Sequence, residues 1–103
     1  MKTLNRICEQ LANGKFSFSH HAFRRAIQRN ISEAEICQAG VDAKLIEAYP
    51  TDKYSPSMLL MGHTKAGRVL HLQVSQADGE LVKIITMYEP DLERWDETYS
   101  IRR

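Results

Sequence analysis

The residues best suited to chemistry lie in one short stretch, HHAFRRAIQRNI, which begins at His20. Imidazole groups can transfer protons near neutral pH, and the planar guanidinium group of arginine matches the oxygens of a phosphate. On a helix, His21, Arg25 and Arg29 are four residues apart and form one stripe, whereas His20 and Arg24 point elsewhere. The stripe is therefore a candidate phosphate site. The alternative is an ordinary solvated helix face.

The overall charge limits what such a site could bind. The chain of 103 residues has 14 lysines and arginines against 13 aspartates and glutamates, which gives a net charge of +1. Any attraction for phosphate must therefore come from a local cluster of positive side chains rather than from the whole chain. The hydrophobic fraction of 43% is sufficient for one core, and we expect a single domain over residues 1–103.

The histidines and cysteines do not have the spacing of metal ligands. The adjacent His20 and His21 point in different directions on a helix, and no HxxxH, HxH or CxxC pair occurs. We therefore predict no metal site and no cofactor. Cys8 and Cys37 are interpreted as free thiols of a cytoplasmic protein. The polar N-terminus argues against a signal peptide, and no apolar run reaches membrane-spanning length, so we expect no membrane partner.

Three helices must position the stripe. Thr3 can cap a first helix that ends at Asn13-Gly14, and Ser19 can cap a second helix that runs from residue 20 to 28 or 29. The apolar face of the second helix is predicted to comprise Ala22, Phe23, Ala26 and Ile27.

A tight corner separates the second helix from the third. Asn30 tolerates the left-handed conformation that ends a helix. Ser32 and Glu35 then form an S-x-x-E capping box, which predicts a third helix to about Ala39 that ends at Gly40. Such a corner would fix the orientation of the stripe.

The hydrophobic period changes from 3.6 to 2 after the third helix. Alternation predicts four strands, at 44–49, 58–63, 68–75 and 81–89, and Asp78-Gly79 is typical of a turn between the last two. Three helices followed by a four-stranded antiparallel meander indicate an α+β fold with two layers. Asp91 can cap a last helical turn after the strands.

The strand faces decide which side chains could meet the stripe. Leu70, Leu72 and Val74 alternate with His71 and Gln73. If the helices cover the leucines, the other two side chains lie on the open face of the sheet.

The last strand is apolar on both faces, so alternation does not assign Tyr88 to either of them. Trp95 is interpreted as a packing lid over the sheet edge.

Four motifs, in this order, resemble a widespread bacterial family of small domains of unknown function, over roughly residues 16–96. They are His21-Ala22-x-x-Arg25-x-x-x-Arg29-x-Ile31-Ser32, Tyr49-Pro50, Gly67-Arg68-x-x-His71, and Ile85-Thr86-x-Tyr88-x-Pro90-Asp91 followed by Trp95. This family is similar in architecture to RelE-like and BrnT-like toxins, within the barnase/colicin/RelE grouping of small metal-free ribonucleases. The resemblance implies a RelE-like two-layer domain, a toxin–antitoxin function, RNA as the substrate and a zinc-finger antitoxin of the MqsA/YgiT kind as a partner.

Metal-free RNA cleavage requires a base, an acid and a cation beside the phosphate. His21 is the candidate base and His71 or Tyr88 the candidate acid or positioning group, although base and acid could be exchanged. The candidate catalytic residues are His21, His71, Thr86 and Tyr88, and the candidate phosphate-binding residues are Arg25, Arg29 and Arg68.

Two other functions remain open at this point. One is a binding module of the same fold that holds nucleic acid or an acidic protein without turnover. The other is an enzyme that acts on a small phosphorylated molecule.

Overall fold

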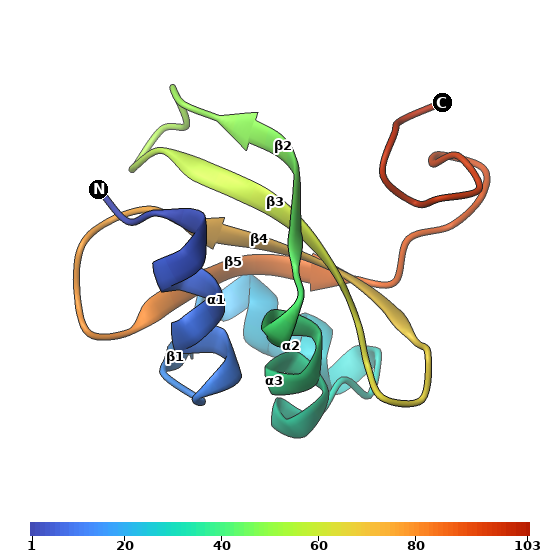
Figure 1. Ribbon diagram of the computed structural model, residues 1–103, viewed down its shortest axis with the longest axis horizontal. Coiled ribbons are helices and arrows are strands. Elements are labelled where there is room, and N and C mark those ends of the chain that lie inside the picture. Colours follow the sequence, from blue (N-terminus) through green and yellow to red (C-terminus); the bar gives the residue numbers. More distant parts are fainter.

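The computed structural model describes residues 1–103 and has three helices on one side of a five-stranded sheet (Figure 1). The strand order is β1-β5-β4-β3-β2, and neighbouring strands are antiparallel except β1 and β5, which are parallel. The predicted α+β class is confirmed. The elements are α1 (Leu4–Ala12), β1 (Phe16–Phe18), α2 (His20–Gln28), α3 (Glu33–Val41), β2 (Lys44–Tyr49), β3 (Ser57–His63), β4 (Val69–Ser75) and β5 (Val82–Tyr88).

The sheet has one strand more than the sequence predicts, and it is mixed rather than purely antiparallel. The additional strand, β1, is only three residues long and pairs with β5, with Phe16 opposite Val82. A strand this short shows no alternation, and its partner lies far away in the sequence, so no local pattern reveals it. Because β1 leads directly into α2, it places the start of that helix beside β5.

The helix ends follow the predicted capping residues. The Ser19 hydroxyl accepts a hydrogen bond from the Ala22 backbone at 3.0 Å, and Ser32 and Glu35 form the complete capping box. Between the two helices Asn30 has a φ of 53°, the left-handed conformation expected of it. The third helix continues slightly beyond the predicted end at Gly40, to Val41.

The core lies between the helices and one face of the sheet. Leu70, Leu72 and Val74 of β4 are fully buried there, as predicted. A side chain at Gly62 of β3 would collide with the backbone of Ala39, so glycine allows α3 to pack directly on the sheet.

The apolar face of α2 is narrower than predicted. Ala22 is fully buried, but Phe23 is 53% exposed and Ile27 is 67% exposed. The reason is the position of α2, which packs only on β1 and β5 at one end of the sheet. A helix at the margin of a sheet buries a single stripe, and the flanking apolar residues stay in contact with water.

A bulge in β5 determines which of its side chains face the helices. Gln73 pairs with Thr86 and Val74 pairs with Ile84, so Ile85 is the extra residue between them. Ile84 and Met87, three positions apart, are therefore both buried in the core. Strict alternation fails at this point, and this is why the sequence does not assign Tyr88 to a face.

The C-terminal segment, residues 91–103, covers the end of the sheet face that the helices leave open (Figure 1). The Asp91 carboxylate accepts from the Arg94 backbone at 3.0 Å, which forms the predicted turn. Trp95 is only 2% exposed and packs edge-on against His71, with ring centroids 4.5 Å apart. The expectation that His71 lies in the open is therefore wrong, because this segment buries it completely.

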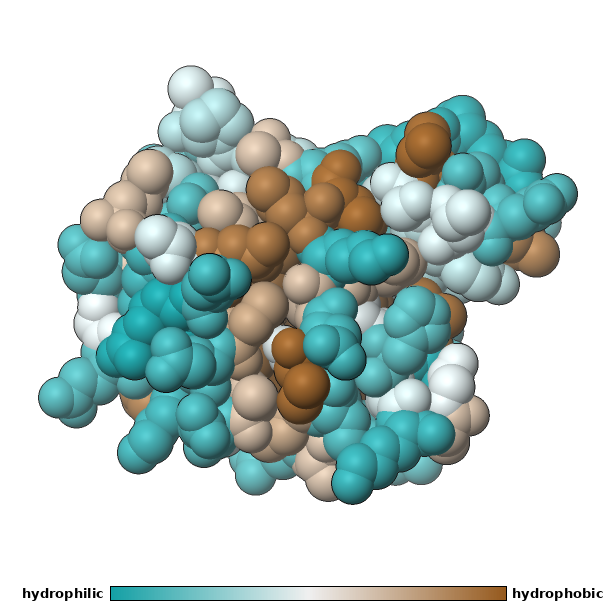
Figure 2. All heavy atoms as spheres, in the orientation of Figure 1, coloured by the Kyte–Doolittle hydropathy of each residue, from teal (hydrophilic) through white to brown (hydrophobic).

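The surface in the view of Figure 2 is mostly hydrophilic, with apolar side chains gathered near β2. Leu45 of β2 and Val41 before it are among the exposed large apolar residues. None of the three helices has the length and apolar content needed to cross a membrane.

Candidate functional site

Two adjoining pockets bring together five of the seven predicted site residues. The first, which we call the arginine pocket, has a volume of about 330 Å³ and is lined by Arg25, Arg29, Thr86, Tyr88, Glu89, Pro90, Asp91, Arg94, Trp95 and Arg102. The second, which we call the Gln73 pocket, has a volume of about 650 Å³ and is lined by Ser19, His21, Asp52, Lys53, Tyr54, Ser55, Gln73, Ser75, Lys83, Ile85 and Thr86. Thr86 lines both, so the two pockets adjoin at this residue, and we refer to them together as the groove.

The predicted stripe runs along one wall of this groove. His21 lines the Gln73 pocket, and Arg25 and Arg29 line the arginine pocket. Strand β5 contributes Thr86 and Tyr88, which follow the bulge. Arg25 and Arg29 are about 6 Å apart along the helix axis, and Thr86 and Tyr88 are almost the same distance apart along the strand, so these two pairs are similarly spaced.

The arginine pocket has an excess of positive charge, with four arginines against two carboxylates, Glu89 and Asp91. The charge of Arg29 helps to lower the pKa of Glu89, although the two side chains form no direct ion pair. The side chains of Arg25, Arg29 and Arg94 form no ion pair and no hydrogen bond with the protein. Arg102 differs, because its Nε donates to Glu47 at 2.8 Å and its guanidinium stacks 4.7 Å from the centre of the Trp95 ring. Three free guanidinium groups in one concave site favour an anion.

A chain of two hydrogen bonds lies beneath the arginine pocket and joins Tyr88, His71 and the Tyr99 carbonyl. His71 Nε2 lies 2.7 Å from the carbonyl oxygen of Tyr99, which can only accept, so this nitrogen carries the proton. His71 Nδ1 is then the acceptor for the Tyr88 hydroxyl, at 3.2 Å. The arrangement fixes the tautomer of the imidazole and the direction of the tyrosine hydroxyl.

Burial controls the protonation of this pair. Burial lowers the pKa of His71, although its bond to the Tyr99 carbonyl opposes the shift. Burial also raises the pKa of Tyr88, against the positive charge of Arg102. Both groups are therefore neutral at pH 7. Tyr88 reaches the pocket, whereas His71 lies beneath it with both ring nitrogens occupied, so His71 can act on a ligand only through Tyr88.

Arg68 lies outside both pockets, and both terminal nitrogens of its guanidinium group are engaged. They donate to Glu35 at 3.0 Å and to Glu89 at 2.8 Å, and also to the backbone carbonyls of Arg29 and Asn30. These bonds fasten the corner between α2 and α3 to the sheet. Hydrogen bonds from the Ser32 backbone and from Arg68 lower the pKa of Glu35, and the bond from Arg68 lowers that of Glu89. The charge of Arg68 is thus paired with two carboxylates rather than available to a phosphate.

His21 is exposed, and its side chain makes no hydrogen bond within the protein. It stands in the first turn of α2, at the mouth of the Gln73 pocket. An imidazole in this position is free to contact a ligand that occupies the groove. No group of three or more His, Cys, Asp or Glu side chains is placed to hold a metal ion.

The comparison with known families now bears on this site. Residues 18–89 match the family described as Domain of unknown function (DUF4258), and the match covers more than half of the chain. The chain belongs to the DUF4258 family. All seven predicted site residues lie inside the DUF4258 match. No curated protein and no solved structure gives a significant match.

Sequence reasoning missed the contribution of the C-terminal segment to the site. Arg94 and Arg102 line the arginine pocket, and the Tyr99 carbonyl sets the tautomer of His71. All three lie beyond the DUF4258 match. The apolar Trp95, which follows β5 closely in the sequence, indicated that the chain folds back onto the sheet. Nothing in the sequence shows which residues the returning chain covers.

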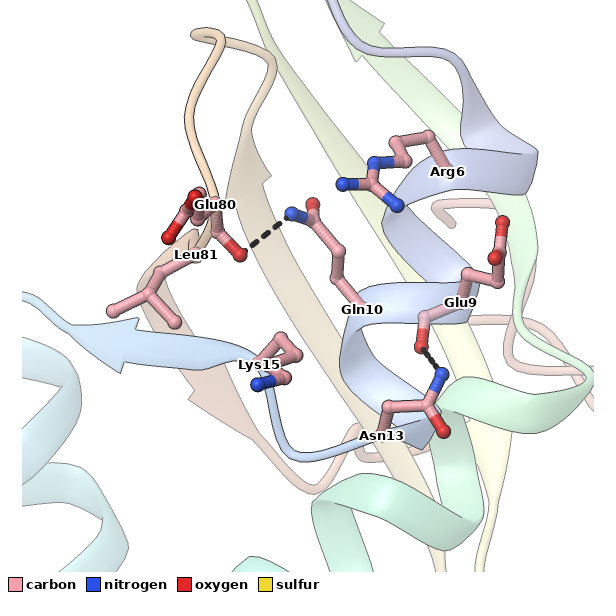
Figure 3. Close-up of a pocket in the computed structure, with 7 residues that line it drawn as sticks. All are labelled: Arg6, Glu9, Gln10, Asn13, Lys15, Glu80 and Leu81. Atoms are coloured by element: carbon pink, nitrogen blue, oxygen red, sulfur yellow. Dashed lines mark hydrogen bonds between the residues drawn. The ribbon is translucent and has the colours of Figure 1, made fainter.

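A third pocket lies outside the groove, between α1 and the loop before β5 (Figure 3). Gln10 is 2% exposed there and donates from Nε2 to the carbonyls of Gly79 and Glu80, at 3.1 and 2.9 Å. Its Oε1 has no hydrogen-bond partner. The side chain serves to attach α1 to this loop, and α1 precedes the DUF4258 match.

Proposed function

We propose that the groove binds RNA and that this DUF4258 protein is a metal-independent ribonuclease. The observation that carries the proposal is the convergence of three unpaired arginines, Arg25, Arg29 and Arg94, with Tyr88 in one pocket. Guanidinium groups without carboxylate partners are suited to hold a phosphodiester and to stabilise the additional charge of a phosphorane.

In the proposed reaction the 2′-oxygen of the RNA attacks the adjacent phosphorus, and His21 accepts the 2′-proton. Arg25 and Arg29 contact the non-bridging oxygens of the phosphorane. The bond from phosphorus to the 5′-oxygen then breaks, which leaves a 2′,3′-cyclic phosphate and a free 5′-hydroxyl. His21 comes from α2 and Tyr88 from β5, and the scheme requires one bound phosphate to lie between them, with the base and the acid on either side.

Tyr88 is proposed to protonate the leaving 5′-oxygen. It is neutral at pH 7 because burial raises its pKa, so it holds a proton to give. The hydroxyl rotates from His71 to the leaving oxygen, and the positive charges of Arg94 and Arg102 stabilise the phenolate that forms. The phenolate then takes a proton from water. His71 is a positioning residue in this scheme, because it contacts only Tyr88 and the C-terminal segment.

The toxin part of the proposal rests on the resemblance to RelE-like and BrnT-like toxins. On that basis we propose a toxin whose partner is a zinc-finger antitoxin of the MqsA/YgiT kind and whose location is the cytoplasm. Expression of the chain should arrest bacterial growth, and the Arg25→Gln variant should relieve the arrest. Equal arrest by the parent and by this variant would argue against an active site in the groove.

The direct test is cleavage of a defined RNA by the purified protein in the presence of EDTA. We expect products with a cyclic phosphate, and losses of at least about 100-fold for His21→Ala, Arg25→Gln and Tyr88→Phe. Arg6→Gln is the control, because Arg6 is an exposed arginine on α1 and shares no pocket with the proposed site residues. Undiminished cleavage in the three variants would contradict the mechanism.

One observation favours a second function, a binding module without turnover. His71 is buried with both ring nitrogens bonded inside the protein, so the groove has one accessible histidine rather than two. In this case the same arginines would bind RNA, but no product would form. Tight RNA binding that depends on Arg25, together with the absence of cleavage over long incubation, would select this function.

A further inference from the structure

The Gln73 pocket is larger than a phosphate requires, and it adjoins the pocket proposed to bind one. Its lining is rich in groups that can hydrogen-bond, and a loop between β2 and β3 forms its outer wall. We propose that this pocket binds the nucleobase next to the bound phosphate and prefers bases with an exocyclic amino group over uracil. This inference rests on the proposed RNA binding, and it adds the part of the substrate that the groove would distinguish.

Two hydrogen bonds fix the orientation of the Gln73 amide. Its Nε2 donates to Ser57 at 3.2 Å and to Asp52 at 3.3 Å. Both partners can accept, so the amide is held with the nitrogen towards them. The Oε1 atom consequently faces elsewhere and makes no hydrogen bond within the protein. It is a fixed acceptor available to a ligand.

The Asp52 carboxyl group carries a negative charge in the same pocket. Hydrogen bonds from the Ser57 hydroxyl, at 2.7 Å, and from the Lys53 backbone lower the pKa of this carboxyl, so it is ionised at pH 7. An ionised carboxylate offers about four acceptor positions. Three are used, by Ser57, Lys53 and Gln73. One acceptor position thus remains, on the Oδ1 atom that accepts from the Lys53 backbone.

Tyr54 presents an exposed aromatic ring at this pocket. Its side chain lines the pocket and is 90% exposed, far more than other large apolar or aromatic residues of the chain. The ammonium group of Lys53 lies 5.3 Å from the centre of its ring. Exposed aromatic rings flanked by cations are the usual platforms on which nucleic-acid bases stack. A base on this ring would have its edge towards Asp52 and Gln73.

These features select bases by their donors. Cytosine, adenine and guanine each have an exocyclic amino group, which can donate to the free acceptors of Asp52 and Gln73. Uracil has one donor at this edge, N3–H, which lies between two carbonyl oxygens. It can therefore bond to only one of the two acceptors and would place a carbonyl oxygen against the other. A site with two acceptors discriminates against a base with a single donor.

Cytidine and uridine monophosphates provide a matched pair of probes, because cytosine has an amino group at the position where uracil has a carbonyl oxygen. Each is titrated into the isotopically labelled protein, with inorganic phosphate as a third ligand, and backbone and Gln73 side-chain resonances are followed by NMR. We expect cytidine monophosphate to shift residues 52–55 and Gln73, with an affinity at least about fivefold higher than that of uridine monophosphate.

Two variants sharpen this test. Tyr54→Ala alters an exposed side chain and should weaken cytidine monophosphate at least about fivefold by removing the stacking surface. Phe23→Ala removes another exposed ring, away from the groove, and should leave the affinity unchanged. Asp52→Asn replaces an acceptor by a donor and should abolish the preference between the two nucleotides.

The outcomes separate this inference from the proposed function. Equal affinity for both nucleotides, or shifts confined to Arg25 and Arg29, would overturn the base pocket and leave the phosphate site standing. Shifts at Gln73 without any response of Arg25 and Arg29 to phosphate would support the base pocket and contradict the proposed phosphate site.

Discussion

Arg25 on helix α2 and Arg68, directly before strand β4, carry the same side chain, but their surroundings are opposite. Arg68 donates to two carboxylates and two backbone carbonyls. Arg25 has no protein partner and lies in a pocket beside Arg29 and Arg94. The first arrangement satisfies a charge and fastens elements together. The second leaves charge available for a ligand.

The difference shows that residue type and spacing do not separate a structural arginine from a binding arginine. Both arginines stand in motifs that the sequence nominates for phosphate, and only the contacts distinguish them. The same holds for the histidines, because His71 is enclosed by Tyr88, Tyr99 and Trp95, whereas His21 faces solvent. Arg68 and His71, whose side chains bond within the protein, thus form an engaged set. Arg25, Arg29 and His21, whose side chains do not, form a free set.

The largest expected effect on stability comes from Arg68. Replacement by methionine leaves Glu35 without its cation and two carbonyls without donors, so the free energy of unfolding should fall by about 2 kcal/mol. Glu89 is half-exposed and adds little to this value, since solvent screens it. Urea denaturation followed by circular dichroism measures the change. An Arg68→Met variant as stable as the parent would show that the network does not fasten the corner.

The next effect is a dependence of stability on pH that originates at His71. Burial lowers the pKa of His71 below the 6.5 of an unfolded chain, so the unfolded state binds the proton more readily. Stability is therefore retained above pH 6.5 and lost as the pH falls below it, at a rate of at most about 1.4 kcal/mol per pH unit. In His71→Gln, whose amide can serve both neighbours, this component should disappear. An unchanged pH profile in the variant would contradict the assignment.

A smaller effect is expected for Tyr88→Phe. The change removes the hydroxyl that donates to His71 and leaves a buried acceptor without a partner, at a cost of about 1 kcal/mol in the free energy of unfolding. NMR of the imidazole nitrogens offers a more specific readout, because the signal of Nδ1 should move while that of Nε2, which bonds to Tyr99, should not. Movement of both signals would indicate a general rearrangement.

The smallest effect on stability is expected for the free arginines. Arg25→Gln and Arg29→Gln break no ion pair, so each should change the free energy of unfolding by less than about 0.5 kcal/mol. Denaturation under the conditions used for Arg68→Met provides the comparison. A loss as large as that of Arg68→Met would place these side chains in the engaged set and remove the basis for a binding site.

The helices and four of the strands could be predicted from the sequence because their signals are local. The capping residues Ser19 and Ser32 and the left-handed Asn30 lie where the sequence places them. The remaining features depend on contacts between distant segments. These are the pairing of β1 with β5, the bulge at Ile85 and the fold-back that buries His71.

In the candidate site, too, only the features with local signals could be predicted. The stripe of His21, Arg25 and Arg29 follows from helical spacing, and the structure places Thr86 and Tyr88 in the same groove. Neither the engagement of Arg68 nor the contribution of the C-terminal segment could be predicted, because each depends on partners many residues away.

The central claim is that the unpaired arginines of α2 bind the RNA backbone. The most direct measurement is the dissociation constant of a single-stranded RNA as a function of salt concentration, for the parent, for Arg25→Gln with Arg29→Gln, and for Arg6→Gln. For the double variant we predict weaker binding and a slope of log affinity against log salt that is smaller by about 1 to 2. Arg6→Gln, on α1 and outside the groove, should match the parent. Equal slopes for the parent and the double variant would contradict the claim.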